Sequence, residues 1–258
     1  GKEPAIVGLD FMHCNRDYNW YNNDQPILDA KTYWDRKGIP VFVWHWRDPS
    51  RKTEEFYTKG TSFDVSKIND PASEEYKAML ADIDYVAGQF KKLQDQNVPA
   101  IWRPLHEAAG GWFWWGAKGA EPCKKLYLLM YDRMVNHHGL KNLIWVWTRE
   151  PGDNAWYPGD NFVDIVGRDI YKEGDHTSHV AEFNTMNTLY GTKKMITLSE
   201  CGSIPDVDNL VADKAAWSWF MPWYGEFTRN SKHNSLDLWK KMFVSSYVIT
   251  LDEMPSLK

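Results

Sequence analysis

The chain has 258 residues, of which 43% are hydrophobic and 25% are charged, and its formal net charge is −5. This length and this apolar share suit a single large domain with a buried core. The acidic balance and the lack of a Lys/Arg block argue against a nucleic-acid partner. No apolar stretch of the sequence is long enough to span a bilayer.

Short apolar segments alternate with longer amphipathic segments, which is typical of a parallel sheet whose strands are connected by helices. Each apolar segment is almost continuous, as expected for strands that are covered on both faces. Seven strands are predicted, at Ile6–Phe11, Val41–Trp46, Ala100–His106, Leu143–Thr148, Ile165–Tyr171, Met195–Glu200 and Trp217–Trp223.

The predicted helices have recognisable ends and a regular apolar spacing. The clearest is Pro71–Gln96, whose apolar residues recur three and four positions apart. We expect Asp70 to cap this helix and Pro71 to occupy its first turn. The others are Pro26–Lys37, Pro122–His138, His176–Tyr190, Val207–Ala215 and Leu236–Tyr247.

This order of elements predicts an α/β fold, a (β/α)8 TIM barrel that forms one catalytic domain over residues 1–258. Because such a barrel has eight strands, one strand either is hidden in a loop or precedes Gly1. We favour the second explanation, since the strand at Ile6–Phe11 follows no helix.

Polar, acidic and aromatic residues follow the predicted strands at their carboxyl ends. In TIM-barrel enzymes the catalytic groups gather at this end of the barrel. This placement indicates an enzyme with a site at the strand ends. The residues are Asp10, His13, His45, Trp46, His106, Glu107, Trp147, Arg149, Asp169, Tyr171, Glu200, Trp219 and Trp223.

The segment Arg103–Gly116 combines charged and aromatic residues directly after an apolar strand. Arg103, His106 and Glu107 come first, and two glycines and the cluster Trp112-Phe-Trp-Trp follow. A carboxyl group can act as an acid or a nucleophile, and indole faces stack on sugar rings. The segment therefore predicts a sugar site. The alternative for the segment is an ordinary buried strand with a capped loop, and the alternative for Glu107 is an ion pair with Arg103.

A second carboxyl group, Glu200, stands where the apolar run Met195–Leu198 stops. Hydrolysis of a glycosidic bond needs one carboxyl to protonate the leaving oxygen and another to attack or to activate water. Glu107 and Glu200 are the candidates for these roles. The alternative for Glu200 is a cap of the helix near Val207.

Other chemistries lack their motifs. A zinc-protease helix needs a second histidine four residues after His106, and position 110 is Gly. His137 and His138 are adjacent, so on a helix they cannot share a ligand face. No G-x-S-x-G or phosphate loop occurs. We therefore expect neither a metal nor another cofactor.

The three cysteines, Cys14, Cys123 and Cys201, contain no C-x-x-C pair. Their odd number precludes complete pairing within one chain. We expect three free, mostly buried thiols.

Taken together, these motifs resemble glycoside hydrolase family 26, whose characterised members are mostly endo-β-1,4-mannanases. The resemblance extends from Pro4 to Pro255. It rests on Arg103-Pro-Leu-His-Glu107, Trp112-Phe-Trp-Trp-Gly116, Gly167-Arg-Asp-Ile-Tyr171, Leu198-Ser-Glu200 and Trp219-Phe-Met-Pro-Trp-Tyr-Gly-Glu-Phe227. The opening Pro4–Met12 resembles the second strand of the family.

The resemblance implies a retaining, double-displacement mechanism in which Glu107 is the acid/base and Glu200 the nucleophile. It implies that Tyr171, held by Asp169, hydrogen-bonds the nucleophile and that Trp112 stacks on sugar near the cleavage point. The remaining residues of the implied substrate-binding set are His45, Arg103, His106, Trp219 and Trp223.

Two departures from the family pattern concern the neighbours of the glutamates. Ala108-Ala109 stand where the family often has Met-Asn or Met-Thr, which affects the expected subsite preference. Cys201 beside the nucleophile is uncommon, and we expect it to be a buried, inert thiol.

The implied substrate is a β-mannan, and the implied protein is a monomer with an extracellular, cell-surface or periplasmic location. The alternatives are the same fold acting on mixed-linkage β-glucan or β-1,3-xylan, and a glycan-binding protein that has lost catalysis. A pure binder would not need both Glu107 and Glu200.

Overall fold

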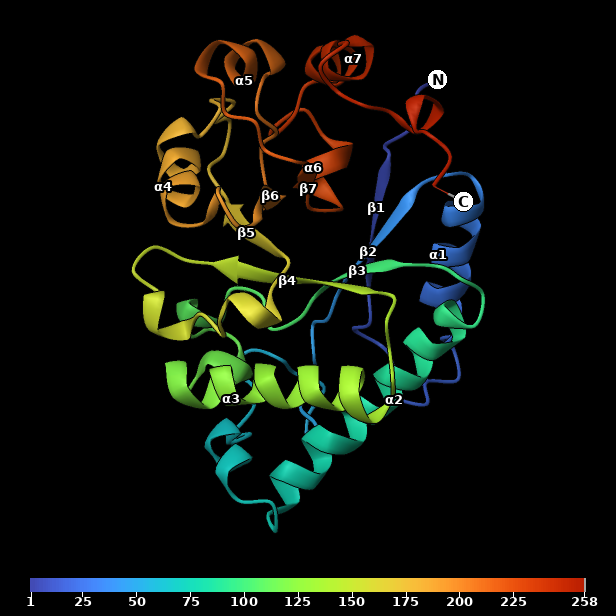
Figure 1. Cartoon of the computed structure of the whole chain (residues 1–258), viewed down its shortest axis with the longest axis vertical. Helices are drawn as coiled ribbons and strands as arrows, with labels where there is room; N and C mark the ends of the chain where they lie inside the picture. Colours follow the sequence, from blue (N-terminus) through green and yellow to red (C-terminus); the bar gives the residue numbers. More distant parts are fainter. Residues whose placement is uncertain (258) are drawn as a thin grey trace. The chain divides into compact units, whose positions relative to one another are not determined.

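The computed structural model describes residues 1–257, which divide into two compact units. One unit, Ile6–Val163, holds strands β1 to β4 and is called the β1–β4 unit. The other combines Gly1–Ala5 with Asp164–Lys258, holds strands β5 to β7 and is called the β5–β7 unit. Figure 1 labels their elements along the chain.

In the β1–β4 unit the strands pair in parallel and in chain order, β1 with β2, β2 with β3 and β3 with β4. Helices connect them, as expected for a parallel sheet. The elements are β1 (Ile6–Asp10), α1 (Gln25–Asp35), β2 (Ile39–Val43), α2 (Glu74–Gln94), β3 (Ala100–Arg103), α3 (Ala120–Tyr131) and β4 (Leu143–Arg149).

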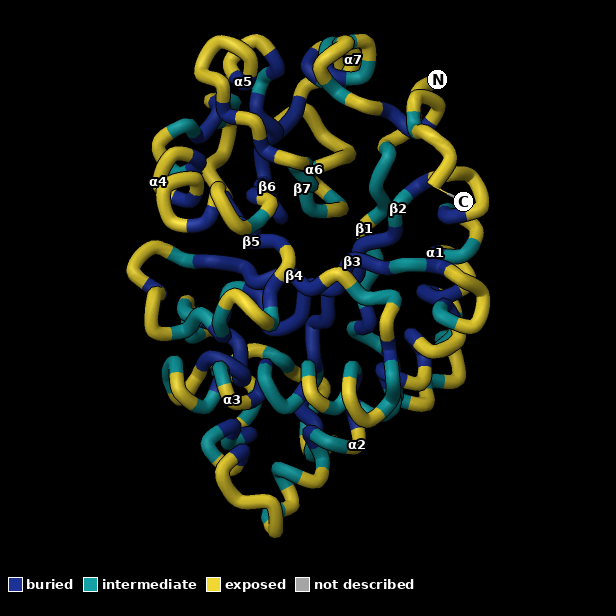
Figure 2. Tube along the Cα trace, viewed as in Figure 1, coloured by how far each residue is buried: buried dark blue, intermediate teal, exposed yellow. Residues whose placement is uncertain are grey.

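The core of this unit lies between the strands and α2. Met79, Ile83 and Phe90 on the inner face of α2 are fully buried. The ring of Phe90 meets that of Trp102 of β3 edge-on, with the centroids 5.0 Å apart. The strands β2 and β3 are accordingly among the buried segments in Figure 2. The predicted apolar face of this helix is confirmed.

The predicted start of α2 was wrong by a few residues. The helix begins at Glu74, and the hydroxyl of Ser73 accepts the hydrogen bond from the Tyr76 backbone N–H at 3.1 Å. Asp70 instead accepts from the N–H of Ala72 and belongs to the turn before the helix. Ser73 rather than Asp70 caps the helix, because the Ser73 hydroxyl lies within hydrogen-bond distance of the third helical N–H.

In the β5–β7 unit the strands are again parallel and paired in chain order. The N-terminal residues join this unit through a bridge between Pro4 and Thr250. The elements are β5 (Ile165–Ile170), α4 (Val180–Tyr190), β6 (Met195–Cys201), α5 (Val207–Asp213), β7 (Phe220–Pro222), α6 (Glu226–Arg229) and α7 (Leu236–Val244).

All seven predicted strands are present within residues 1–257, with altered bounds. The second ends at Val43 rather than Trp46, because the N–H of His45 donates to the Asp10 carboxylate instead of to a neighbouring strand. The last is reduced to Phe220–Pro222. The short helix α6 was not predicted.

The six predicted helices are all present, also with altered bounds. The segment predicted as Pro122–His138 begins at Ala120 and changes into a π-helical turn at Asp132–His137. The segment predicted from His176 becomes helical only at Val180.

Two expectations about the whole chain can be compared directly with the structure. The three cysteines are buried and free, as expected. Across residues 1–257, no helix combines the length and the apolar character needed to cross a membrane.

Candidate active site

Glu107 lies on the loop that follows β3, and its backbone is in the left-handed region with a φ of 53°. Leu105, two residues earlier, is left-handed as well. Non-glycine residues rarely adopt this conformation, and such residues cluster at functional sites. The indole N–H of Trp112 donates to the Glu107 carboxylate at 3.0 Å, and Trp112 itself is 42% exposed.

The geometry around Trp112 depends on a glycine. The indole lies so close to Gly110 that a Cβ on this residue would stand only 2.0 Å from the nearest ring atom. Any side chain at position 110 would therefore push the ring away from Glu107.

His106 is buried next to Glu107 within an aromatic cage. Its ring centroid lies 4.6 Å from that of His45 and 5.1 Å from that of Phe113. Burial, with smaller contributions from Arg103 and His45, holds the pKa of His106 well below its usual value. The imidazole is thus neutral at physiological pH, so it can donate one hydrogen bond and accept another.

His45 is oriented by Asp10, which ends the adjacent strand β1. The Nδ1 of His45 lies 2.7 Å from Asp10 Oδ2, and the other carboxylate oxygen accepts from the N–H groups of His45 and Met12. A carboxylate on one ring nitrogen fixes how the ring is turned. The strand-end pattern had singled out Asp10, although the predicted site did not include it.

Arg103, predicted to bind substrate, is fully buried at the end of β3. Its guanidinium donates to the hydroxyl of Thr148 on β4 at 3.2 Å. This contact ties the ends of two strands together beneath the loop that carries Glu107.

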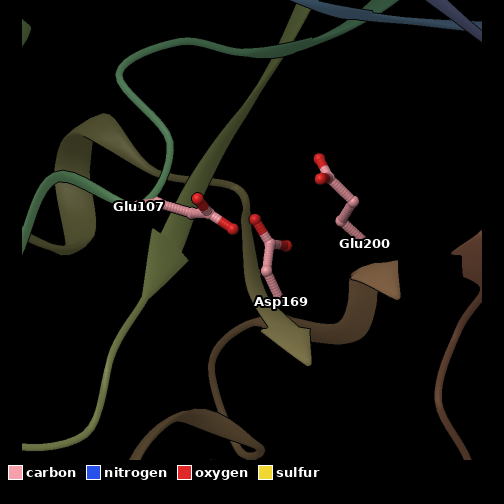
Figure 3. Close-up of side chains that lie close together, drawn as sticks. All are labelled: Glu107, Asp169 and Glu200. Atoms are coloured by element: carbon pink, nitrogen blue, oxygen red, sulfur yellow. The ribbon is translucent and has the colours of Figure 1, made fainter. Parts of the chain in front are cut away.

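In the β5–β7 unit, Asp169 and Glu200 are register partners on the paired strands β5 and β6. Figure 3 draws both carboxylates at the ends of these strands, and it also labels Glu107. Glu200 is only 5% exposed, and it accepts a hydrogen bond from the Tyr171 hydroxyl. The contact expected between Tyr171 and Glu200 is therefore present.

The strand that carries Asp169 ends earlier than predicted, and Asp169 has a further hydrogen-bond partner. Tyr171 is the first residue after β5 rather than part of it. Asp169 accepts a hydrogen bond from the hydroxyl of Ser199 at 2.6 Å. Gly167 makes this approach possible, because a Cβ there would stand 2.3 Å from the Ser199 oxygen.

Cys201, which follows Glu200, is fully buried. Burial, together with the charges of Glu200 and Asp169, raises the pKa of its thiol well above the usual value. The thiol stays protonated at neutral pH, and protonated thiols are poor nucleophiles. The expectation of an inert cysteine agrees with this setting.

Trp219 and Trp223 flank β7 rather than lying on it as predicted. Both are half-buried. The carbonyl of Trp219 accepts from Leu198 of β6, and the N–H of Trp223 donates to the carbonyl of Cys201. Backbone contacts thus fix both tryptophans beside the strand that carries Glu200.

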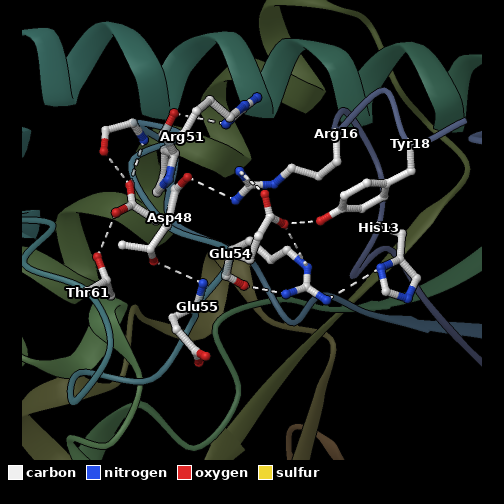
Figure 4. Close-up of polar contacts among 12 residues, drawn as sticks. His13, Arg16, Tyr18, Asp48, Arg51, Glu54, Glu55 and Thr61 are labelled. Carbon is white, nitrogen blue, oxygen red and sulfur yellow. Dashed lines mark hydrogen bonds and ion pairs between the residues drawn. The ribbon is translucent and has the colours of Figure 1, made fainter.

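The predicted site omits an aromatic group on the loop after β1. Trp20 is 65% exposed and stacks on Tyr18 with ring centroids 4.9 Å apart, and His13 contacts both rings. Figure 4 shows how Tyr18 reaches Glu54, with Arg16 close to the same carboxylate. The run Tyr18-Asn-Trp-Tyr21 in a loop was the signal available in the sequence.

Comparisons with known proteins agree with this architecture. The model of glycosyl hydrolase family 26 matches residues 1–253. A mannan endo-1,4-beta-mannosidase of Thermothelomyces thermophilus is 43% identical over 98% of this chain and 54% of its own length. Mannan endo-1,4-beta-mannosidase B of Piromyces sp. is 40% identical over 99% of this chain and 45% of its own length. The chain thus spans about half the length of these curated relatives.

Among solved structures, a beta-mannanase from a symbiotic protist of the termite Reticulitermes speratus, complexed with gluco-manno-oligosaccharide, is 44% identical. Its TM-score is 0.92, over 99% of this chain and 82% of that one. The Podospora anserina GH26-CBM35 beta-(1,4)-mannanase has the same TM-score at 39% identity, over 98% of this chain and 59% of that one.

These similarities confirm the predicted α/β fold of the (β/α)8 class, with seven parallel strands within residues 1–257. The family model matches nearly the whole chain, and such a match shows family membership. The chain belongs to glycosyl hydrolase family 26.

Proposed function

We propose that this chain hydrolyses internal β-1,4-mannosidic bonds of mannan, galactomannan or glucomannan with retention of anomeric configuration. Membership of family 26 supports a glycoside hydrolase. The names of the relatives support mannan as the substrate, and the gluco-manno-oligosaccharide in complex with the protist enzyme supports a mannose-containing oligosaccharide as ligand.

In the proposed reaction Glu200 attacks the anomeric carbon while Glu107 protonates the leaving glycosidic oxygen. The C–O bond to the leaving sugar breaks, and a glycosyl ester to Glu200 forms. Glu107, now ionised, then takes a proton from a water molecule, whose oxygen displaces Glu200 from the anomeric carbon. Both carboxyl groups return to their starting states.

The observation that carries the assignment is the setting of Glu200. It is buried at the end of a strand, and its carboxylate accepts a hydrogen bond from the hydroxyl of Tyr171. A hydrogen bond to the charged form of a carboxyl group favours ionisation. An ionised, rigidly held carboxylate is what a nucleophile requires.

The setting of Glu107 supports the acid/base role. The group is half-buried on a loop, where leaving groups and water can reach it, and the indole N–H of Trp112 fixes the orientation of its carboxyl group. The partly exposed indole of Trp112 offers a face for a sugar ring.

The remaining residues of the proposed site bind and orient the substrate. His45 and His106 would line the position of the reacting sugar, Arg103 would support this wall from beneath, and Asp169 would support the nucleophile's surroundings. Trp219 or Trp223 would form the floor under the sugar. The exposed aromatic group at Trp20 would provide a stacking surface for sugar units of the polysaccharide that lie farther from the cleaved bond.

The proposal extends to the context in which the chain works. Polymeric mannan lies outside cells, so we propose an extracellular, cell-surface or periplasmic location. We also propose that residues 1–258 act as a single catalytic domain and as a monomer.

The test is hydrolysis of linear mannan, galactomannan, glucomannan, mixed-linkage β-glucan and β-1,3-xylan by the purified chain. We expect mannans to release reducing ends fastest, and proton NMR to detect the β-anomer before mutarotation. Initial release of the α-anomer would refute retention, and faster cleavage of the glucan or xylan would refute the substrate. Tight oligosaccharide binding without cleavage would refute the enzyme assignment.

A further inference from the structure

Asn234 is a buried side-chain amide that hydrogen-bonds the backbone around the segment after Glu200. It is 2% exposed and directly precedes the cap residue of α7. Its Oδ1 accepts from the N–H of Ile204 at 2.7 Å. Its Nδ2 donates to the carbonyl of Gly202 at 2.9 Å and to that of Phe227 at 2.7 Å.

The amide orientation follows from its partners. Two carbonyl oxygens require two donor hydrogens, and one backbone N–H requires an acceptor, so only one placement of O and N satisfies all three. Asn234 thus joins three backbone positions, two in the segment that leaves β6 and one in α6. Among side chains of this size, only that of asparagine offers two donor hydrogens and an acceptor oxygen in this arrangement.

Two of these positions hold Tyr171 in place. A Cβ on Gly202 would stand 3.1 Å from the ring of Tyr171 and 3.2 Å from that of Phe227, so both rings pack directly against this glycine. The two rings also meet edge-on, with centroids 5.4 Å apart. Moreover, the N–H of Gly202 donates to the carbonyl of Ile170, the residue before Tyr171.

We propose that Asn234 is a positioning residue that fixes Gly202 and Phe227 around the ring of Tyr171, and so holds the Tyr171 hydroxyl on Glu200. The inference rests on the proposed function, because its consequence for turnover requires Glu200 to be the nucleophile. Nothing in the side chain of Asn234 needs to touch substrate. Asn234 affects turnover only through the packing of Gly202 and Phe227 around the ring of Tyr171.

Asn234→Asp keeps the shape of the side chain but places a carboxyl oxygen, in place of the amide NH2 group, opposite two carbonyl oxygens. We expect kcat on mannan to fall about tenfold or more, with KM nearly unchanged, because the hydrogen bond from the Tyr171 hydroxyl to the Glu200 carboxylate is weakened. In a Tyr171→Phe background the same change should lower kcat by at most about threefold, because the affected hydrogen bond is already absent.

Phe227→Leu provides a second route to the same test if Asn234→Asp fails to fold. It loosens the packing on Tyr171 and leaves the buried amide satisfied. We expect a fall in kcat that likewise shrinks to at most about threefold in the Tyr171→Phe background. Asn209→Asp is the matched control, because Asn209 is exposed and its side chain donates to the carbonyl of His176 at 2.9 Å. Its kcat should equal that of the unmodified chain.

Equal falls in kcat with and without the Tyr171 hydroxyl would overturn the inference, since Asn234 would then act by another route. A crystal structure of Asn234→Asp separates this failure from failure of the proposed function. If the unmodified chain hydrolyses no mannan, the proposed function is wrong. The positioning role is wrong if Tyr171 still donates to Glu200 in that variant as it does in the unmodified chain.

Discussion

The two glutamates occupy contrasting settings. Glu107 stands on a loop, in a left-handed backbone conformation, and receives an indole N–H from five residues further along the same loop. Glu200 stands on a strand, is almost fully buried, and receives a phenol O–H from the neighbouring strand end. The contrast teaches that loop packing sets the position of one carboxyl group, and strand register that of the other.

The largest expected effect comes from Glu200→Ala. Removing the proposed nucleophile should lower kcat on mannan by about 10⁴-fold or more. The circular dichroism spectrum should stay unchanged, because the strand keeps its backbone pairing. Near-normal turnover on mannan would end the assignment of Glu200.

Glu107→Ala should give a smaller loss that depends on the substrate. Removing a general acid costs about 10²- to 10⁴-fold where the leaving group needs a proton. Aryl mannosides with activated leaving groups should lose much less in the first step, and added azide should restore turnover. The measurement is kcat/KM for mannan and for an activated aryl glycoside. Equal losses on both substrates would contradict an acid role.

The sequence predicted best what depends on local order along the chain. Glu200 follows the largely apolar segment Met195–Leu198, so its place at a strand end could be predicted directly, and the same holds for Tyr171 after Ile165–Ile170. The paired strands then bring the two side chains together. The inner face of α2 followed from apolar residues that recur three and four positions apart.

The sequence did not predict contacts that join segments far apart in the chain. Asp82 appears in the sequence as one polar residue among the apolar positions of α2. In the structure it is 3% exposed and accepts hydrogen bonds from Asn15, Trp46 and Arg51, on the loops after β1 and β2. No local pattern links a helix residue to three loop residues, because the link exists only after the loops fold.

Asp82→Asn should show how strongly this buried residue stabilises the loops of the β1–β4 unit. An amide has one acceptor oxygen, and its own N–H groups would face the donors of Trp46 and Arg51. We expect the free energy of unfolding to fall by about 2 kcal/mol. Urea denaturation at neutral pH measures it. A fall no greater than that of an outward-facing aspartate on the same helix would refute the role of Asp82.

Asp84 supplies that outward-facing comparison. Its side chain is 30% exposed and pairs with Arg133 and His138. Burial alone would raise the pKa of Asp84, but the hydrogen bonds from Arg133 and His138 outweigh it, and the pKa is lowered. Asp84→Asn should therefore cost only about 0.5 to 1 kcal/mol at pH 7, because solvent screens the pair.

The pH dependence of that cost tests its electrostatic origin. A carboxyl group with a lowered folded-state pKa stabilises the fold fully above its unfolded pKa of about 4, and this stabilisation is lost as the pH falls through the folded value. The difference in unfolding free energy between the unmodified chain and Asp84→Asn should thus persist at pH 7 and close below about pH 4. A constant difference would mean that Asp84 acts through packing.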